Sequence, residues 1–264
     1  EPSMAAGWDA HVHVFEAGAP VRAGHYTPQA RTLDEIEALG AAHGIGHLVL
    51  VQPSVYGTDN GVLLRALRRT PGRHRGVAVV DGGFTGAQLD ELHAAGVRGV
   101  RFNLVSPVGN GEDDLQALAP LLRERGWHVQ WYAHAPQLPH LLALQQRSGL
   151  RFVLDHLAGL TAGVPISEDA WQALAELAAG GAWLKLSGWY RLGSWEPYAD
   201  IVPLVRRASA LFGDRLVWGS DWPHTSLPAA ASRHPSLLQP MRQALGDAAA
   251  QAVLENHPPR LYGA

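Results

Sequence analysis

Cysteine is absent from the 264-residue chain, and lysine occurs once, at position 185. Without a thiol, the chain has no disulfide, no thiolate nucleophile and no zinc–cysteine site. No apolar run is long enough to span a membrane, and the first residues lack the basic and then apolar pattern of a signal peptide. Charged residues make up 17% of the chain and the net charge is −3, which indicates neither a nucleic-acid nor a membrane-surface partner. We therefore expect a soluble, cytoplasmic protein.

Eight short apolar runs recur along the sequence, with amphipathic stretches between them. Each run is rich in Val, Leu or aromatic residues, and most have the length of a β-strand. The runs cover residues 7–15, 47–52, 75–81, 97–103, 128–134, 151–156, 183–187 and 216–221. One expected helix begins with a capping-box pattern at Thr32 and Glu35, and Gly44 follows its end. Further helices are expected at residues 86–95, 114–125, 136–146, 168–179, 201–212 and 237–255.

The alternation of eight strands with helices predicts an α/β protein built from parallel βαβ units. At this length, a closed (β/α)8 barrel, or TIM barrel, is the favoured fold. An open doubly wound sheet is the alternative, but no glycine-rich phosphate-binding loop follows the first run. No linker or internal repeat divides the chain, so we predict one domain over residues 1–264.

Residues capable of chemistry gather at the ends of these runs. In a (β/α)8 barrel the active site is built at the C-terminal ends of the strands. Asp9, His11 and His13 alternate in the first run, and the two-residue period points all three into the barrel mouth. Asp9 lies deepest and is expected to orient an imidazole or a neighbouring strand. His156 ends the sixth run and Asp221 ends the eighth, which outweighs the ordinary interpretation of each as a structural side chain.

These motifs resemble those of the amidohydrolase superfamily. The motifs are Asp-x-His-x-His at residues 9–13, Leu-Asp-His at 154–156 and Trp-Gly-Ser-Asp-Trp-Pro-His at 218–224. Within its amidohydrolase 2 group, the chain is similar to the 2-pyrone-4,6-dicarboxylate lactonases nearly end to end. Further matching stretches are residues 26–28, 51–54, 57–60, 98–103, 126–129 and 259–262. The resemblance implies a hydrolase of ester bonds that opens lactones in bacterial-type catabolism.

The resemblance also implies a role for each site residue. The lactone carbonyl would be held and polarised by His11, His13 and His156. Asp221 would act as the general base on water, which suits a carboxylate placed near the ring. The acidic substrate would be held by Tyr26, Ser54, Arg101, Tyr132 and Arg191. For these five residues, packing, turn hydrogen bonds or a salt bridge on the barrel rim is the competing interpretation.

Two departures from the lactonase pattern concern the substrate. The lactonases have further arginines shortly after the strand-four motif and three residues after the strand-six histidine. Here the corresponding positions lie near residues 106–107 and at Gly159. Fewer cationic groups predict a substrate with fewer carboxylates or with hydroxyls, such as an aldonolactone, a muconolactone-type ring or a sulfonated analogue.

The sequence leaves the metal content open. Binuclear sites of the superfamily commonly use a carboxylated lysine on strand four, and Lys185 lies on the seventh run, so that arrangement is excluded. A single zinc ion would need about four ligands, for which the candidates are His11, His13, His134 and Asp221. The resemblance favours no cofactor, with the same histidines acting as hydrogen-bond donors.

Three functions are therefore weighed. The first is a lactone hydrolase with Asp221 as base and a small-molecule lactone as its partner. The second is a mononuclear zinc hydrolase or decarboxylase of the same superfamily. The third is a non-catalytic barrel that binds a small ligand, which the presence of the base and of three histidines disfavours. Either a monomer or a homodimer is compatible with the sequence.

Overall fold

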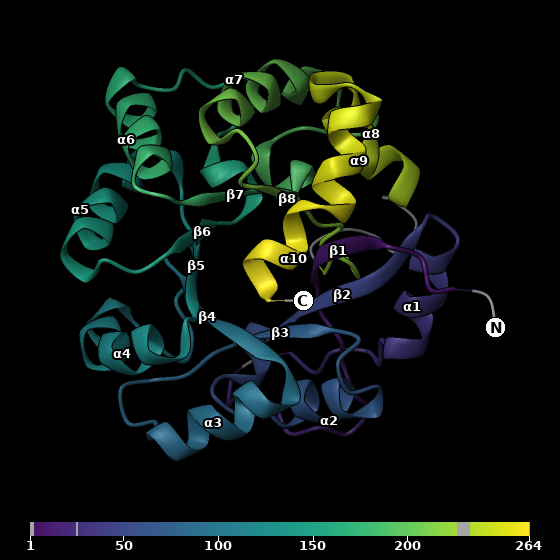
Figure 1. Cartoon of the computed structure of the whole chain (residues 1–264), viewed down its shortest axis with the longest axis vertical. Coiled ribbons are helices and arrows are strands. Elements are labelled where there is room, and N and C mark those ends of the chain that lie inside the picture. The colour runs from purple at the N-terminus through teal and green to yellow at the C-terminus, as the bar shows by residue number, and fades with distance from the viewer. Residues whose placement is uncertain (1–2, 25, 226–232, 264) are drawn as a thin grey trace.

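The computed structural model describes residues 3–24, 26–225 and 233–263. Eight strands form one parallel sheet in which each strand pairs with the next along the chain (Figure 1). The strands are β1 (Gly7–Val12), β2 (Ile45–Val51), β3 (Arg75–Ala78), β4 (Val97–Asn103), β5 (His128–Tyr132), β6 (Phe152–Leu154), β7 (Trp183–Leu186) and β8 (Leu216–Trp218). This order is the one predicted from the alternating pattern.

Helices surround the ring of strands (Figure 1). Those between strands are α1 (Leu33–Ala41), α2 (Gly61–Arg69), α3 (Gly86–Ala95), α4 (Glu112–Arg125), α5 (Leu138–Ser148), α6 (Glu168–Ala179) and α7 (Val202–Phe212). After β8 follow α8 (His234–Leu245), α9 (Asp247–Glu255) and α10 (His257–Tyr262). Short 3-10 helices are η1 (Ser54–Tyr56), η2 (Ala135–Gln137), η3 (His156–Gly159), η4 (Trp189–Leu192) and η5 (Ala199–Ile201). Among the described helices, none is both long and apolar enough to cross a membrane.

The segment after β8 joins β1 and brings the ends of the sheet together. Val12 and Trp222 form a parallel bridge. The His13 N–H donates to the Trp222 carbonyl at 2.9 Å, and the Asp221 N–H donates to the His11 carbonyl at 2.8 Å. These bonds lie at the C-terminal side of the strands and confirm the predicted (β/α)8 barrel. They also place the two key sequence motifs next to each other.

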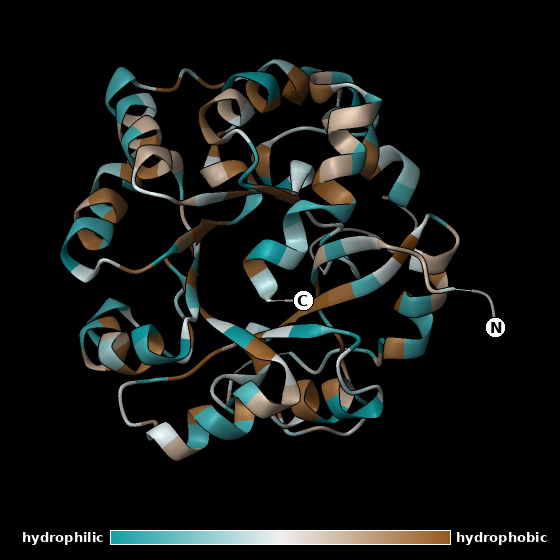
Figure 2. Ribbon diagram, in the orientation of Figure 1, coloured by the Kyte–Doolittle hydropathy of each residue, from teal (hydrophilic) through white to brown (hydrophobic). Residues whose placement is uncertain are grey.

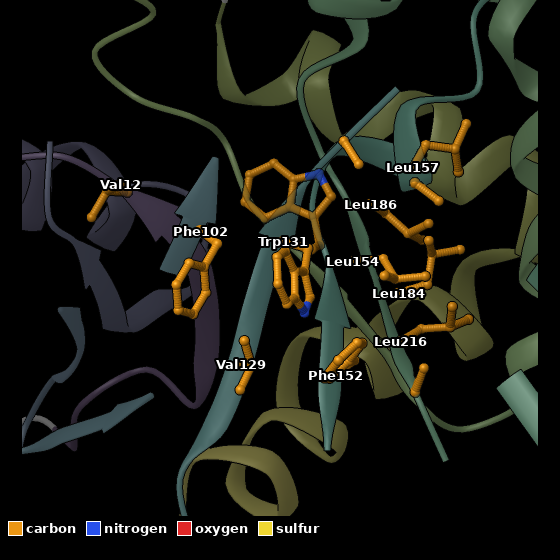
Figure 3. Packing of buried hydrophobic residues seen from close by; sticks show 14 of the residues in the cluster. Val12, Phe102, Val129, Trp131, Phe152, Leu154, Leu157, Leu184, Leu186 and Leu216 are labelled. Atoms are coloured by element: carbon orange, nitrogen blue, oxygen red, sulfur yellow. The ribbon is translucent and has the colours of Figure 1, made fainter. Parts of the chain in front are cut away.

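Alternate strand residues fall into two apolar clusters. The larger cluster contains strand and helix residues and fills the layer between them. There the Trp131 ring lies between Phe102 and Phe152, with centroids 4.9 and 5.3 Å away (Figure 3). Hydrophilic and hydrophobic residues alternate along the ribbons of the surrounding helices (Figure 2). The smaller cluster contains only strand residues and the end of α10, which lies across the ring in Figure 1.

Two helical segments differ from the sequence expectation. The nine-residue α2 was not predicted, although Val62, Leu63 and Leu67 give it a buried face. The single helix expected at 237–255 is two helices, because Gly246 ends α8 and starts the turn into α9 with a φ of 84°. The capping box of Thr32 and Glu35 is confirmed at the start of α1.

Candidate active site

A cavity of about 330 Å³ opens at the C-terminal ends of the strands. A concave space of this size suits a small molecule. Its lining includes all nine residues that the sequence analysis assigned to catalysis or substrate binding: His11, His13, Tyr26, Ser54, Arg101, Tyr132, His156, Arg191 and Asp221. Tyr26 is the outermost of them, with 58% of its surface exposed. The barrel therefore brings together groups from eight separate parts of the sequence.

Asp9 does not line this cavity, which corrects the expected direction of its side chain, but it does orient a neighbouring part of the barrel as expected. The pairing of β1 with β2 shifts register between Asp9 and Val12, so the two-residue alternation is interrupted before His11. The Asp9 carboxylate accepts hydrogen bonds from the Ser220 N–H, at 2.8 Å, and from the Ser220 hydroxyl. Its other side faces His234 of α8, with 3.5 Å between Oδ2 and Nε2. Asp9 thus anchors the segment that carries Asp221.

The two carboxylate oxygens of Asp221 have different surroundings. Oδ2 accepts hydrogen bonds from the Tyr190 hydroxyl and from Arg191 Nε, the latter at 2.7 Å. Oδ1 is buried and has no hydrogen-bond partner among the described residues. Burial would raise the pKa of Asp221, but the charge of Arg191 and the hydrogen bond from the Tyr190 hydroxyl hold it below its ordinary value. Asp221 is therefore ionised, with one oxygen left for chemistry.

Two imidazoles face the free Asp221 oxygen. The Nε2 atom lies 3.5 Å from Oδ1 in His11 and 3.7 Å in His13. The Nδ1 atom of His13 lies 2.7 Å from the Val51 carbonyl, and because a carbonyl only accepts, this nitrogen carries the proton. Burial lowers the pKa of His13 to about 4 and that of His11 well below its ordinary value. At neutral pH both rings are uncharged, so His13 presents a lone pair to the cavity.

His156 is the third imidazole of the site. It lies two residues after the end of β6 and has a φ of 50°, and its Nδ1 lies 2.8 Å from the Ser187 hydroxyl. Gly188 leaves room for the ring, since a Cβ there would lie 2.5 Å from His156 Nδ1. The His156 ring centroid is 4.8 Å from that of His11 and also 4.8 Å from that of Tyr132. Burial lowers the pKa of His156 to about 4, so this ring is also neutral near pH 7.

Two arginines supply positive charge to the cavity. Arg101 is buried, and its Nη1 donates to the Gln52 carbonyl at 2.8 Å. That carbonyl is its one hydrogen-bond acceptor among the described residues, which leaves further N–H groups for a ligand. Arg191 is engaged with Asp221, and although burial lowers the pKa of Arg191, the Asp221 charge raises it above its ordinary value. The two arginines therefore differ, since only Arg191 pairs with the candidate base.

The predicted zinc ligand set is not assembled. His134 is exposed, lines a different cavity and caps the short helix η2. Within the described ranges, the ligand atoms close enough to hold one ion belong to His11, His156 and Asp221, which lie within 4.8 Å of one another. This trio is a candidate metal site by distance. Two neighbouring cations would repel a divalent metal ion at this trio. Arg191 Nε lies 2.7 Å from Asp221 Oδ2, and Lys185 Nζ lies 3.0 Å from His11 Nδ1.

Four residues next to the site received no role from the sequence. Tyr190 binds Asp221, and the polar side chains of Gln130, Asp155 and Lys185 lie beneath His11. Lys185 offered a detectable signal, since a lone lysine stands between leucines in an apolar strand. Tyr190 offered none, because an aromatic residue next to Arg191 is equally typical of packing.

Fold and site together define an enzyme-like barrel with its polar groups at the C-terminal mouth. The family model described as Amidohydrolase matches residues 8–264. The chain is 36% identical over 237 residues to the 2-pyrone-4,6-dicarboxylate hydrolase of Comamonas testosteroni, covering 83% of this chain and 77% of that protein. It is 31% identical over 267 residues to a 4-sulfomuconolactone hydrolase of Rhizobium radiobacter, covering 97% and 89%.

A solved structure also relates the chain to a probable lactone hydrolase. The crystal structure of a probable 2-pyrone-4,6-dicarboxylic acid hydrolase from Acinetobacter baumannii, with citric acid bound, has a TM-score of 0.86 to this chain at 29% identity. The comparison covers 98% of this chain and all of that one. The chain belongs to the amidohydrolase family, and lactone hydrolases are among its relatives.

Proposed function

We propose that this protein hydrolyses a small anionic lactone, acting on the ring ester bond with Asp221 as the general base. The observation that carries the proposal is Asp221 Oδ1, a buried carboxylate oxygen without a hydrogen-bond partner that faces two imidazoles on the cavity wall. Relatives that hydrolyse lactones support the same reaction class. A ligand-binding barrel would not need an ionised carboxylate kept free in this way.

The attacking water is held between Asp221 and His13. Both Asp221 Oδ1 and His13 Nε2 are acceptors, and they lie 3.7 Å apart. One water can donate a hydrogen bond of about 2.8 Å to each of them. Asp221 takes one proton as the water oxygen bonds to the lactone carbonyl carbon. This assignment gives His13 the water, where the sequence resemblance gave it the carbonyl.

The remaining imidazoles stabilise the negative charge that develops on the carbonyl oxygen. His11 and His156 lie on the cavity wall with ring centroids 4.8 Å apart, so their N–H groups can converge on one oxygen. The tetrahedral intermediate then collapses, the ring C–O bond breaks and the proton on Asp221 passes to the leaving alkoxide. Water and lactone thereby give one hydroxy acid, and the base is regenerated.

The substrate is proposed to carry one anionic group. In and beneath the cavity, the positive charges of Arg101, Arg191 and Lys185 outnumber the negative charges of Asp155 and Asp221 by one, with the imidazoles neutral. A carboxylate or sulfonate held by Arg101 would balance this charge. Tyr26, Ser54 and Tyr132 supply further hydroxyl groups to the ligand.

The backbone at residue 159 leaves no room for an arginine that could bind a second carboxylate of the substrate. Gly159 occupies the position where the dicarboxylate lactonases have an arginine, and its φ is 76°. A Cβ at Gly159 would lie 2.1 Å from the Ala133 carbonyl oxygen, so this backbone admits no side chain there. A lactone with a single carboxylate or sulfonate, such as a muconolactone-type ring, fits better than a dicarboxylate.

A panel of lactones tests the proposal. The panel contains a muconolactone-type ring with one carboxylate, a sulfonated analogue, an aldonolactone and the pyrone dicarboxylate. We expect ring opening, followed by acid release, with the highest kcat/KM for a lactone that bears one anionic group. Turnover of the dicarboxylate above all others would refute the proposed specificity. The absence of hydrolysis across the panel would refute the lactone hydrolase itself.

A further inference from the structure

The one lysine of the chain lies fully buried directly beneath His11. Lys185 is on β7, between Leu184 and Leu186, and its side chain turns inward while theirs belong to the outer apolar layer. Its Nζ lies 3.0 Å from His11 Nδ1 and 3.2 Å from Asp155 Oδ1. Burying an ammonium group is costly unless it is paired, so this position calls for an explanation. The proposed hydrolysis does not use Lys185.

The hydrogen bonds around Lys185 have only one consistent direction. Asp155 can only accept, so the group that bonds its Oδ2 at 2.9 Å is the amide NH2 of Gln130. The Gln130 carbonyl oxygen then faces Lys185 Nζ at 2.8 Å and accepts from it. Burial lowers the pKa of Lys185, and the charge of the Asp155 carboxylate, 3.2 Å away, opposes this effect and favours the ammonium form.

An ammonium group has three donors and no acceptor. Lys185 Nζ donates to the Gln130 carbonyl oxygen, forms an ion pair with Asp155 Oδ1 at 3.2 Å and lies 3.0 Å from His11 Nδ1. His11 Nδ1 must therefore accept, which leaves the proton of the neutral ring on Nε2. The alternative partner for Nδ1, Asp155 Oδ1, lies 3.7 Å away and is too distant for a hydrogen bond.

We propose that Lys185 is a positioning residue that holds His11 in the Nε2–H tautomer, so that His11 donates into the cavity and does not bind a metal ion there. His13 provides the contrast, because the Val51 carbonyl holds its proton on Nδ1. The two histidines of one motif thus face Asp221 with opposite hydrogen-bonding character. That the His11 proton serves a lactone carbonyl rests on the proposed function, whereas the tautomer itself does not.

The contact between Lys185 and His11 also affects metal binding by the candidate trio of His11, His156 and Asp221. To bind a metal through Nε2, a neutral His11 would have to carry its proton on Nδ1. That proton would then face the Lys185 ammonium group across 3.0 Å, with both groups acting as donors. Metal binding would therefore lose this hydrogen bond and place a dication near a fixed cation. Lys185 accordingly disfavours a metal at this trio.

The tautomers can be read directly by long-range ¹H–¹⁵N correlation spectra of the ¹⁵N-labelled protein near pH 7. Comparison with His11→Gln and His13→Gln assigns the two rings. We expect the Nε2–H pattern for His11 and the Nδ1–H pattern for His13 in the wild-type protein. An Nδ1–H pattern for His11 would overturn the proposal, whatever the lactone panel shows, since no substrate is involved.

Variants then test whether Lys185 is the cause. Lys185→Met alone would leave the Asp155 carboxylate buried without its partner, so the double variant K185M/D155N, which removes both charges, is the sharper test. We expect it to lose the uniform Nε2–H pattern of His11 and to keep the Nδ1–H pattern of His13 as an internal control. An unchanged His11 pattern in the folded double variant would show that Lys185 does not set the tautomer. The wild-type spectrum remains decisive if the variant does not fold.

Zinc binding provides a second readout that needs no turnover. In equilibrium dialysis against zinc ions, we expect the double variant to bind zinc about tenfold or more tightly than the wild-type protein, because changes behind a ligand alter metal affinity by this order. The additional change His11→Gln in the double variant should abolish the gain. Equal or tighter zinc binding by the wild-type protein would contradict the role of Lys185 in disfavouring a metal.

Discussion

The two carboxylate oxygens of Asp221 have different surroundings. Tyr190 and Arg191 hold Oδ2 in place, and Oδ1 stays free beside His11 and His13. The backbone holds Asp221 in this position, because the residue lies three residues after β8 with a φ of 60° and its N–H donates to the His11 carbonyl. A residue so fixed pays little reorganisation cost when it takes a proton.

Replacing Asp221 by Asn should remove the base and keep the shape of the site. We expect kcat to fall about 10²- to 10⁴-fold, the usual contribution of a general base. Binding of a product acid, followed by calorimetry, should be retained. Asp113→Asn, on the exposed first turn of α4, is the matched control and should leave kcat unchanged. An Asp221→Asn variant with wild-type kcat would exclude Asp221 as the base.

Arg101 should determine the preference for anionic lactones. Arg101→Met keeps an unbranched side chain but removes the charged donors. We expect kcat/KM for a lactone with one carboxylate to fall about 10- to 150-fold, which corresponds to the loss of one charge-assisted interaction. An uncharged lactone should be affected much less, and Arg69→Met, an exposed arginine of α2, serves as control. An equal loss for both kinds of lactone would assign Arg101 a purely structural role.

At the scale of elements, Gly188 makes room for the imidazole of His156. Gly188 has a φ of 66° and a Cβ there would lie 2.5 Å from His156 Nδ1, whereas Gly149 has a φ of 64° and open space at the same position. Gly149→Ala should cost about 1–2 kcal/mol in the free energy of unfolding, from the left-handed backbone alone. Gly188→Ala should cost more and should also lower kcat, because His156 must move. Denaturant unfolding and kinetics check this, and equal costs with unchanged kcat would contradict it.

The sequence predicted the elements well where periodicity and caps act locally. The bounds of α3 and α6 agree with the expected helices, and the Thr32 capping box starts α1. The first strand is less well predicted, because its register depends on a distant part of the chain. The register shift after Asp9 depends on pairing with β2, so no local pattern reveals that the Asp9 side chain does not line the cavity with His11.

The sequence predicted the candidate-site residues whose positions follow from the ends of the strands. All nine proposed residues line one cavity because parallel strands end at the same face of the barrel. His134 also follows a strand, but the chain turns there into η2 and leaves its side chain exposed. The Tyr190 contact with Asp221 arises from the fold of η4, which the sequence pattern does not specify.

At the scale of the whole molecule, buried histidines make stability depend on pH. Burial lowers the pKa of His74 and of His128 from the ordinary 6.5 to about 3. Below pH 6.5 the unfolded chain takes up protons that the folded barrel excludes, so stability is full above this value and falls as the pH drops towards 3. His13 and His156, with a pKa of about 4 each, add to the loss.

Replacing His128 by Leu should flatten this dependence. We expect the decrease in unfolding free energy between pH 7 and pH 4 to shrink by on the order of 2–3 kcal/mol. The reason is that leucine, unlike His128, takes up no proton when the chain unfolds at low pH. Urea unfolding at both pH values measures the effect. The difference between variant and wild type at pH 7 reports the packing change alone. The same slope in both proteins would show that His128 does not contribute.

The central claim is that the barrel opens an anionic lactone with its own side chains and without a metal. The most direct test measures metal content and the hydrolysis rate of the preferred lactone before and after exhaustive dialysis against a chelator. We predict an unchanged rate and a metal content far below one ion per chain after dialysis. Stoichiometric zinc whose removal abolishes turnover, and whose return restores it, would contradict the account.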